Sequence, residues 1–205
     1  MPGPSPDFWD ARFAEPTLAY GAAPNDFLKD SADRLPVGRT LCLAEGQGRN
    51  AVYLARRGHD VLAVDLSDVG LARARQLASE RGVEIATQVA DLGAFEIEPG
   101  AWDCIVSIYA HTPADVRRRL HAQVAQGLRP GGAFVLEAYT PEQTRRDTGG
   151  PSGEAAIDIT MTAAGLRDEL AGLRVETLHE IEREVHEGPY HTGLAAVVQM
   201  LGWRD

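Results

Sequence analysis

The segment 44–51 has the composition of a loop that brings its backbone close to a bound ligand. It reads Ala-Glu-Gly-Gln-Gly-Arg-Asn-Ala and directly follows an apolar run. Gly46 and Gly48 permit a tight turn and leave no Cβ between the backbone and a ligand. Their spacing from Ala51 also satisfies the fingerprint of dinucleotide-binding loops. The loop by itself predicts a nucleotide-like ligand without identifying it, and a turn with no ligand is the alternative.

Two carboxylates follow the next two expected strands, at the same edge of the expected sheet. Asp65 ends the second apolar run and Asp91 the third. A carboxylate at Asp65 can accept hydrogen bonds from both hydroxyls of a ribose. Asp91 can accept one from the exocyclic amine of an adenine while Leu92 packs on the ring. Without the other motifs, Asp91 would be interpreted as a solvated residue at a strand end.

These residues need a parallel sheet to position them. Apolar runs alternate with amphipathic stretches, which is typical of βαβ units. Strands are expected at 39–44, 59–64, 83–89, 102–108 and 133–139, and helices at 50–57, 67–81, from 112 to before 130, and 162–170. The runs 174–185 and 192–203 have only a short turn between them, which predicts a final hairpin.

Together these elements predict an α/β fold of the doubly wound, Rossmann-like type. Its sheet would be seven-stranded and mostly parallel, and would end in an antiparallel hairpin. Thr112 is expected to cap the helix that follows it, with Pro113 at the first helical position. We expect a single domain over residues 1–205, with an N-terminal helical segment over 1–36 and the sheet and hairpin over 37–205.

Composition excludes several classes of partner. The chain has 205 residues, 44% of them hydrophobic, and a formal net charge of −10, so nucleic acid and membrane surfaces are poor partners. No apolar run approaches the ~20 residues of a membrane span, and the first residues lack the features of a signal peptide. Cys42 and Cys104 lie in apolar runs, outside any metal-ligand spacing. We therefore expect reduced core thiols, no metal site and a cytoplasmic location.

A nicotinamide-dependent oxidoreductase is the competing interpretation of the glycine loop. Enzymes of the doubled type need a second mononucleotide-binding half, and residues 128–132 precede the fifth strand without a second glycine loop. Single-domain reductases of this length need a Tyr-x-x-x-Lys pair. The only lysine is Lys29, and the residue four positions before it is Asn25. The sequence therefore disfavours this class.

The order of these motifs resembles the class I S-adenosylmethionine-dependent methyltransferases over essentially the whole chain. The segment 45–50, Glu-Gly-Gln-Gly-Arg-Asn, is similar to the subgroup that contains tellurite- and thiopurine-resistance methyltransferases. The resemblance is specific for the cofactor S-adenosylmethionine, with S-adenosylhomocysteine as product. It is unspecific for the methyl acceptor.

The resemblance implies a set of cofactor-binding residues. Glu45 and the glycine backbone would face the methionine portion, and Ser107 would lie beside its amino group. Asp65 would hold the ribose, with Leu66 beside the adenine. The full set comprises Glu45, Gly46, Gly48, Asn50, Asp65, Leu66, Asp91, Leu92 and Ser107.

The acceptor side depends on two further residues. In the resembling group the N-terminal segment folds over the cofactor, and Tyr20 is the lid candidate that would exclude water. His111, after the fourth strand, could act as a general base for a hydroxyl or amine acceptor. A thiolate or a chalcogen oxyanion would need no base.

The acceptor is expected to be a small molecule. The Asn/Asp-Pro-Pro-Tyr signature of amino-methylating nucleic-acid enzymes is absent, because residues 109–113 read Tyr-Ala-His-Thr-Pro. A non-catalytic S-adenosylmethionine-binding domain is the alternative function. We expect a monomer or a homodimer.

Overall fold

A single seven-stranded sheet organises the molecule. The computed structural model describes residues 5–146 and 148–205. The strands are β1 (Arg39–Leu43), β2 (Asp60–Asp65), β3 (Ala86–Val89), β4 (Trp102–Ile108), β5 (Leu128–Tyr139), β6 (Arg174–His186) and β7 (Thr192–Trp203). Their order is β3-β2-β1-β4-β5-β7-β6, with β1 to β5 mutually parallel and β7 antiparallel to both neighbours. The predicted fold class, with its terminal hairpin, is confirmed.

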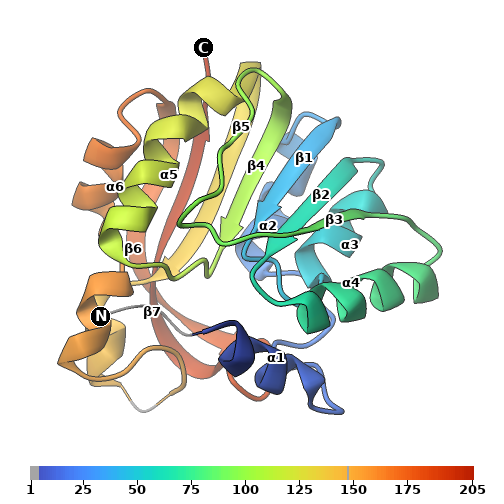
Figure 1. Cartoon of the computed structure of the whole chain (residues 1–205). Coiled ribbons are helices and arrows are strands. Elements are labelled where there is room, and N and C mark those ends of the chain that lie inside the picture. Colours follow the sequence, from blue (N-terminus) through green and yellow to red (C-terminus); the bar gives the residue numbers. More distant parts are fainter. Residues whose placement is uncertain (1–4, 147) are drawn as a thin grey trace.

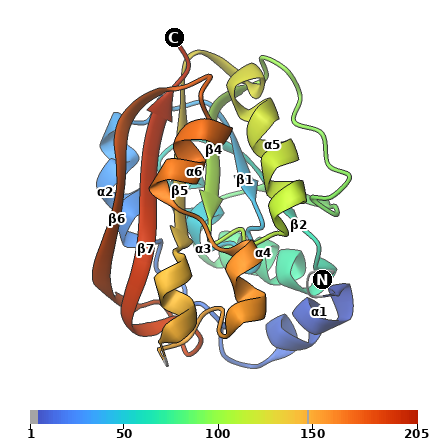
Figure 2. The same cartoon turned by 90° about the vertical axis from the view of Figure 1, so that its left-hand side faces the viewer.

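Helices cover both faces of this sheet. They are α1 (Pro6–Ala14), α2 (Asp26–Ser31), α3 (Arg49–Ala55), α4 (Asp68–Glu80), α5 (Ala114–Gly127) and α6 (Ala163–Glu169), with short 3-10 helices at η1 (Ala32–Arg34), η2 (Pro141–Arg145) and η3 (Glu154–Ile159). One core cluster joins α5 and α6 to one face of the sheet, and another joins α2, α3 and α4 to the opposite face. Figure 2 shows α5 and α6 on one side of the strands and α2 on the other.

The alternation of side chains along the strands explains both core layers. Leu41 and Ile105 point into the layer beneath α5 and α6, while Cys42 and Cys104 point into the opposite layer. Both thiols are buried and free, as predicted. Among the described residues, no helix is both long and apolar enough to cross a membrane.

Several predicted boundaries differ from the observed ones; the third strand, expected over 83–89, is β3 at Ala86–Val89. Two further differences arise from contacts between distant elements. The expected Thr112 cap is wrong: Pro113 is the N-cap, in an extended conformation, and α5 begins at Ala114. The Ala114 N–H donates to the Asp158 Oδ2 atom at 3.2 Å, so a carboxylate from a remote loop satisfies this helix end. The fifth strand begins at Leu128 rather than 133, because Leu128 pairs with Trp102 of β4.

The N-terminal segment packs against the carboxyl-end edge of the parallel strands. Figure 1 shows α1 at this edge, near the bend of the β6–β7 hairpin. The Tyr190 N–H in that bend donates to the Ala19 carbonyl at 3.4 Å. Gly188 is also tightly packed, since a Cβ there would lie 2.6 Å from the Ala19 oxygen. The first and last parts of the chain thus meet above the sheet edge.

Candidate active site

The glycine loop connects β1 to α3 through left-handed backbone conformations. Ala44, Gly46 and Gly48 have φ values of 52°, 57° and 87°. A Cβ at Gly48 would lie 2.5 Å from the Ala74 Cβ of α4, and one at Gly46 would lie 2.9 Å from the Phe13 ring of α1. Both glycines are therefore required by close packing within the protein as well as by backbone conformation.

Glu45 stabilises the start of α3 from inside the loop. Its Oε1 atom accepts the backbone N–H groups of Asn50 at 2.9 Å and Ala51 at 2.8 Å. The side chain is buried. Burial raises the pKa of the Glu45 carboxyl to about 7, although the backbone hydrogen bonds oppose this rise. Glu45 is thus a buried carboxyl that exchanges its proton near neutral pH.

Asp65 connects the second strand to the same loop. Its Oδ2 atom accepts the Gly46 N–H at 2.8 Å, and its Oδ1 atom accepts the Ser67 N–H at 2.9 Å. Burial raises the pKa of this carboxyl, against the lowering effect of those hydrogen bonds. Each carboxylate oxygen has further lone-pair capacity. Asp65 can therefore accept ligand hydroxyls while it holds the loop.

A cavity of about 820 Å³ lies at this edge of the sheet. The sequence-predicted residues that line it are Tyr20, Glu45, Gly46, Gly48, Asn50, Asp65, Leu66, Asp91, Leu92 and His111. Ser107 is buried in β4, one position before Ile108, which also lines the cavity. The structure thus brings ten of the eleven predicted residues to one cavity, and Ser107 is the predicted residue that does not line it.

One end of the cavity combines an apolar surface with an exposed carboxylate. Leu92 is buried, whereas Asp91 is exposed and accepts the Gly93 N–H on its Oδ1 atom at 2.7 Å. Leu66, which follows Asp65, lines the same region. A flat heteroaromatic ring with a hydrogen-bond donor on its edge matches this combination.

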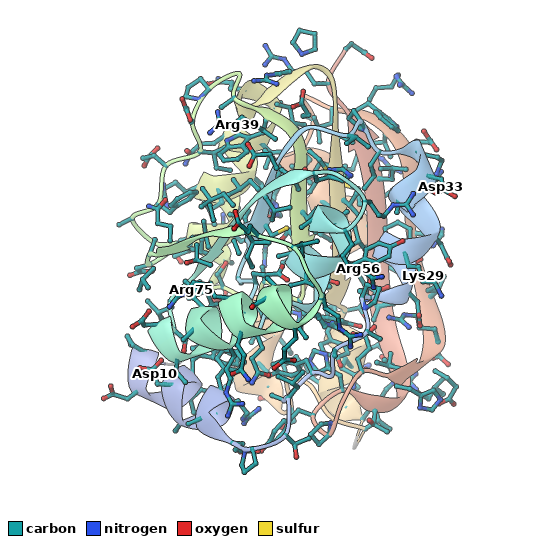
Figure 3. All side chains as sticks on the ribbon, turned by 90° about the vertical axis from the view of Figure 1, so that its right-hand side faces the viewer. Asp10, Lys29, Asp33, Arg39, Arg56 and Arg75 are labelled. Atoms are coloured by element: carbon teal, nitrogen blue, oxygen red, sulfur yellow. The ribbon has the colours of Figure 1, made fainter. Side chains whose placement is uncertain are left out.

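Helix α1 forms a wall over the glycine loop. Trp9 and Phe13 line the cavity and stack at 5.6 Å between ring centroids. On the same helix, Asp10 accepts a hydrogen bond from the Ser67 hydroxyl at the start of α4. Figure 3 shows Asp10 on α1 beside α4. This wall makes the cavity deeper than the sheet edge alone would.

Gln47 fastens the N-terminal segment to the loop, a role that sequence reasoning missed. Its Oε1 atom accepts the Ala19 N–H at 2.8 Å, and its Nε2 atom donates to the Phe13 carbonyl at 3.3 Å. Asn50 acts similarly, since its Oδ1 atom accepts the Asn25 N–H at 2.9 Å. No local sequence signal marks these contacts.

The other end of the cavity is aromatic. Tyr20, Tyr109, His111 and His191 all line it. The His191 ring lies 4.4 Å from the Tyr20 ring and 4.5 Å from the Tyr109 ring, measured between centroids. Tyr109 has a φ of 55°, a conformation uncommon for a large residue, which turns the chain out of β4. Sequence reasoning assigned no role to Tyr109, although it lies between Ser107 and His111.

The geometry argues against His111 as a general base. Its Nε2 atom accepts the Tyr139 backbone N–H at 3.1 Å, so its lone pair is already engaged. Burial lowers the pKa of His111 to about 3, with His191 and Arg117 adding to the decrease. A neutral ring with Nε2 as acceptor carries its proton on Nδ1. His111 can donate a hydrogen bond into the cavity but is poorly arranged to take a proton.

A buried ion network lies behind the aromatic end. Glu187 accepts hydrogen bonds from Arg49 at 2.6 Å, Arg183 at 2.8 Å and Asn25 at 2.9 Å. Glu137 of β5 accepts from Arg183 at 2.6 Å and from Asn25 at 2.7 Å. The network joins the N-terminal segment, α3, β5 and the hairpin. Its charged residues lie up to 138 positions apart in the chain, so no sequence motif predicts that they come together.

Comparison with known families gives these features a context. Residues 41–132 match the family model described as a methyltransferase domain. The chain is 25% identical over 141 residues to 2-heptyl-1-hydroxyquinolin-4(1H)-one methyltransferase of Mycobacteroides abscessus, covering 67% of this chain and 62% of the relative. It is 32% identical over 105 residues to tRNA 5-carboxymethoxyuridine methyltransferase of Escherichia coli, covering 49% and 40%. The first three curated relatives are matched over 62%, 41% and 48% of their lengths.

Solved structures share the fold of this chain. A protein solved in a study of the conversion of a disulfide bond into a thioacetal group during echinomycin biosynthesis superposes with a TM-score of 0.72, at 23% identity, over 95% of this chain and 86% of that one. TehB from Haemophilus influenzae superposes with a TM-score of 0.73, at 20% identity, over 88% and 62%. These similarities establish the common fold.

Proposed function

This chain belongs to the class I S-adenosylmethionine-dependent methyltransferases, and we propose that it transfers a methyl group from S-adenosylmethionine to a small-molecule acceptor. The observation that carries the proposal is the convergence of Glu45, Asp65 and Asp91 on one cavity, each from the end of a successive strand. Ligands of doubly wound sheets bind at this edge.

The chemistry of the cavity fits the cofactor. Its volume of about 820 Å³ is within the range of small-molecule sites. Asp65 has free lone pairs for a ribose, and Leu66, Leu92 and Asp91 suit an adenine. In its ionised form, Glu45 offers a negative charge to the cationic methionine portion, with Ser107 predicted nearby. Among the groups of the cavity, these would hold the cofactor.

The bound cofactor supplies a methyl group on a cationic sulfonium. The chain's own residues have two tasks, to place the acceptor in line with that methyl group and to keep water away. The walls formed by α1 and Tyr20 would exclude water, and the aromatic end would hold the acceptor. Tyr20 contributes this enclosure rather than a proton transfer, since burial raises the pKa of its hydroxyl further above neutrality.

A soft or aromatic acceptor suits the acceptor end best. Tyr20, Tyr109 and His191 present ring faces and edges, which favour flat or polarizable groups. The Mycobacteroides relative is named for a hydroxyquinolone, and the echinomycin structure concerns sulfur chemistry. The net charge of −10 disfavours tRNA, the acceptor named for another relative. We therefore propose a thiol, an aromatic or N-hydroxy hydroxyl, or a chalcogen oxyanion.

The most direct test supplies S-adenosylmethionine with a deuterated methyl group and a panel of acceptors. The panel contains thiophenol, 4-nitrophenol, a 1-hydroxyquinolone, selenite, tellurite, benzylamine and unmodified tRNA, and mass spectrometry detects the transferred label. We expect label on a thiol, an acidic hydroxyl or a chalcogen. Label on tRNA alone would contradict the small-molecule acceptor. Cofactor binding with no labelled product would favour the non-catalytic binding domain.

A cytoplasmic location agrees with this proposal. Cys42 and Cys104 are free and buried in the sheet, as is usual for proteins of reducing compartments.

A further inference from the structure

We propose that Arg49 and His191 form the subsite that binds and deprotonates the acceptor, and that the acceptor therefore has an acidic O–H or S–H group. This inference rests on the proposed methyl transfer and names the class of nucleophile. It replaces His111 with His191 as the residue that takes the proton.

Arg49 has a buried guanidinium group in which one nitrogen has no hydrogen-bond partner among the described residues. It is the first residue of α3, its side chain is 8% exposed, and it lines the cavity. Its Nη2 atom donates to the Glu187 Oε2 atom at 2.6 Å. Its Nη1 atom is buried and, among the described residues, has no hydrogen-bond partner. Leaving such a donor unsatisfied is costly, so an anionic ligand atom is the partner that this geometry favours.

The Nδ1 atom of His191 is a second buried atom that has no hydrogen-bond partner among the described residues. His191 is 7% exposed, lines the cavity and follows the bend of the hairpin. Its Nδ1 atom is buried and lies 3.9 Å from the same Glu187 Oε2 atom, which is too long for a hydrogen bond. Burial lowers the pKa of His191, against the effect of Glu187, so the ring is neutral and has a free lone pair near pH 7.

Glu187 is hydrogen-bonded to Arg49, lies beside His191 and is itself fixed. Its other oxygen, Oε1, accepts from Arg183 and Asn25 at 2.8 and 2.9 Å. Burial favours its neutral form, but His191, Arg49 and Arg183 outweigh burial and hold its pKa well below the ordinary range. A permanently ionised carboxylate beside a histidine supports the imidazolium that forms when the ring takes a proton.

The three tyrosines that pack around His191 do not compete for this role. Tyr20 and Tyr109 contact the His191 ring, and burial raises the pKa of both hydroxyls. Tyr109 also donates to Glu137 at 2.8 Å, so its proton is engaged. Tyr139, 5.4 Å from His191 between centroids, is likewise neutral because burial raises its pKa.

The transfer step balances with these two residues. The O–H or S–H bond of the acceptor breaks, and its proton goes to the unprotonated ring nitrogen of His191. The electron pair of the acceptor forms the bond to the methyl carbon, and the pair of the broken carbon–sulfur bond remains on sulfur. Arg49 stabilises the negative charge that develops on the acceptor. His191 then returns its proton to solvent.

This arrangement selects acidic acceptors over amines. An amine attacks as a neutral group, so it gains nothing from the Arg49 guanidinium and is repelled by it when protonated. A thiol, a phenol or an N-hydroxy group attacks as an anion, which Arg49 stabilises directly.

The test measures the ionisation of 4-nitrophenol bound to the complex with S-adenosylhomocysteine, since the phenolate absorbs at longer wavelength than the phenol. The wild-type complex should bind the phenolate and lower the pKa of the bound probe. Arg49→Met and His191→Phe should each raise that pKa by about one unit, a tenfold change in the ionisation equilibrium. Arg56→Met is the matched control, because Arg56 is exposed at the end of the same helix (Figure 3).

Two further measurements distinguish a variant that does not fold or does not bind cofactor from one that has lost only the proposed subsite. Calorimetry with S-adenosylhomocysteine, together with thermal unfolding, shows whether each variant is folded and binds cofactor. If Arg49→Met does not fold, Arg49→Lys keeps the contact to Glu187 and should give an intermediate pKa. Wild-type binding of S-adenosylhomocysteine with no binding of 4-nitrophenol, or a probe pKa unchanged by both variants, overturns the inference alone. Failure to bind S-adenosylhomocysteine rejects the proposed function instead.

Discussion

Glu45 and Asp65 each perform a structural task at the place where a ligand would bind. Both accept backbone N–H groups of the glycine loop or of the helix that follows it. Their carboxyls are buried, so the protein retains charged or titratable groups there at a cost in stability. Such a cost is common at functional sites, where residues are selected for chemistry as well as for folding.

The pH dependence of stability tests the burial of Glu45. The folded carboxyl has a pKa of about 7, compared with 4.5 ordinarily. Between these values the folded chain keeps the proton that the unfolded chain has lost, so the free energy of unfolding falls as pH rises and levels off above pH 7. We predict that Glu45→Gln removes this fall, which is at most about 3 kcal/mol. Urea unfolding of both proteins at pH 5 and pH 8 measures it; parallel changes in the two proteins would refute the shifted pKa.

Residues at strand ends could be predicted from sequence, and residues of the ion network could not. Asp65 and Asp91 directly follow apolar runs, so the parallel topology alone places them together. Arg49 lies inside the recognised loop, but its partner Glu187 is 138 positions away. Only the bend of the hairpin over the sheet edge brings them together. His111 was recognised as a cavity residue, but its hydrogen bond to the Tyr139 backbone could not be foreseen.

At the scale of elements, α1 and the segment after it act as one side of the cavity. Phe13 packs against Gly46 of the loop and Gly70 of α4, where an added Cβ would lie 2.9 and 2.8 Å from its ring. Gln47 adds hydrogen bonds from the loop to both ends of the segment 13–19. Because Gly46 and Gly70 have no side chains, α1 can pack this close to the loop and to α4.

Removing the Phe13 ring should therefore release α1 while leaving the sheet folded. We predict that Phe13→Ala increases amide hydrogen exchange in α1 and weakens S-adenosylhomocysteine binding by on the order of tenfold. Phe8→Ala is the control, because Phe8 belongs to the same helix and is 45% exposed. Exchange in α1 that stays as slow as in the wild-type protein would mean that other contacts hold the helix.

Some boundaries of helices and strands cannot be predicted from local sequence patterns. The alternation of apolar runs and helices predicts the parallel strands, because their burial on both faces requires continuous apolar segments. The start of α5 depends instead on Asp158, a residue 44 positions from Ala114. The start of β5 depends on the pairing of Leu128 with Trp102. Both are set by tertiary contacts that a local pattern does not contain.

At the scale of the whole molecule, the apolar core and the candidate site occupy different parts of the fold. The two apolar layers lie on the faces of the sheet, and the polar and aromatic groups gather at one edge, where the N-terminal segment and the hairpin close over it. The position of the site along this edge follows from the strand order, since β2 and β4 lie on opposite sides of β1. A nicotinamide cofactor would bind at the same edge of such a sheet, so the residues of the cavity, rather than the fold, distinguish S-adenosylmethionine from NAD or NADP.

Calorimetric titration of the protein with S-adenosylmethionine, S-adenosylhomocysteine, NAD and NADP tests the central claim most directly. We predict that the first two bind with dissociation constants on the order of micromolar and that the nicotinamide cofactors do not bind. Binding of NAD or NADP, or no binding of S-adenosylmethionine and S-adenosylhomocysteine, would contradict the assignment of this cavity and of the methyl transfer built on it.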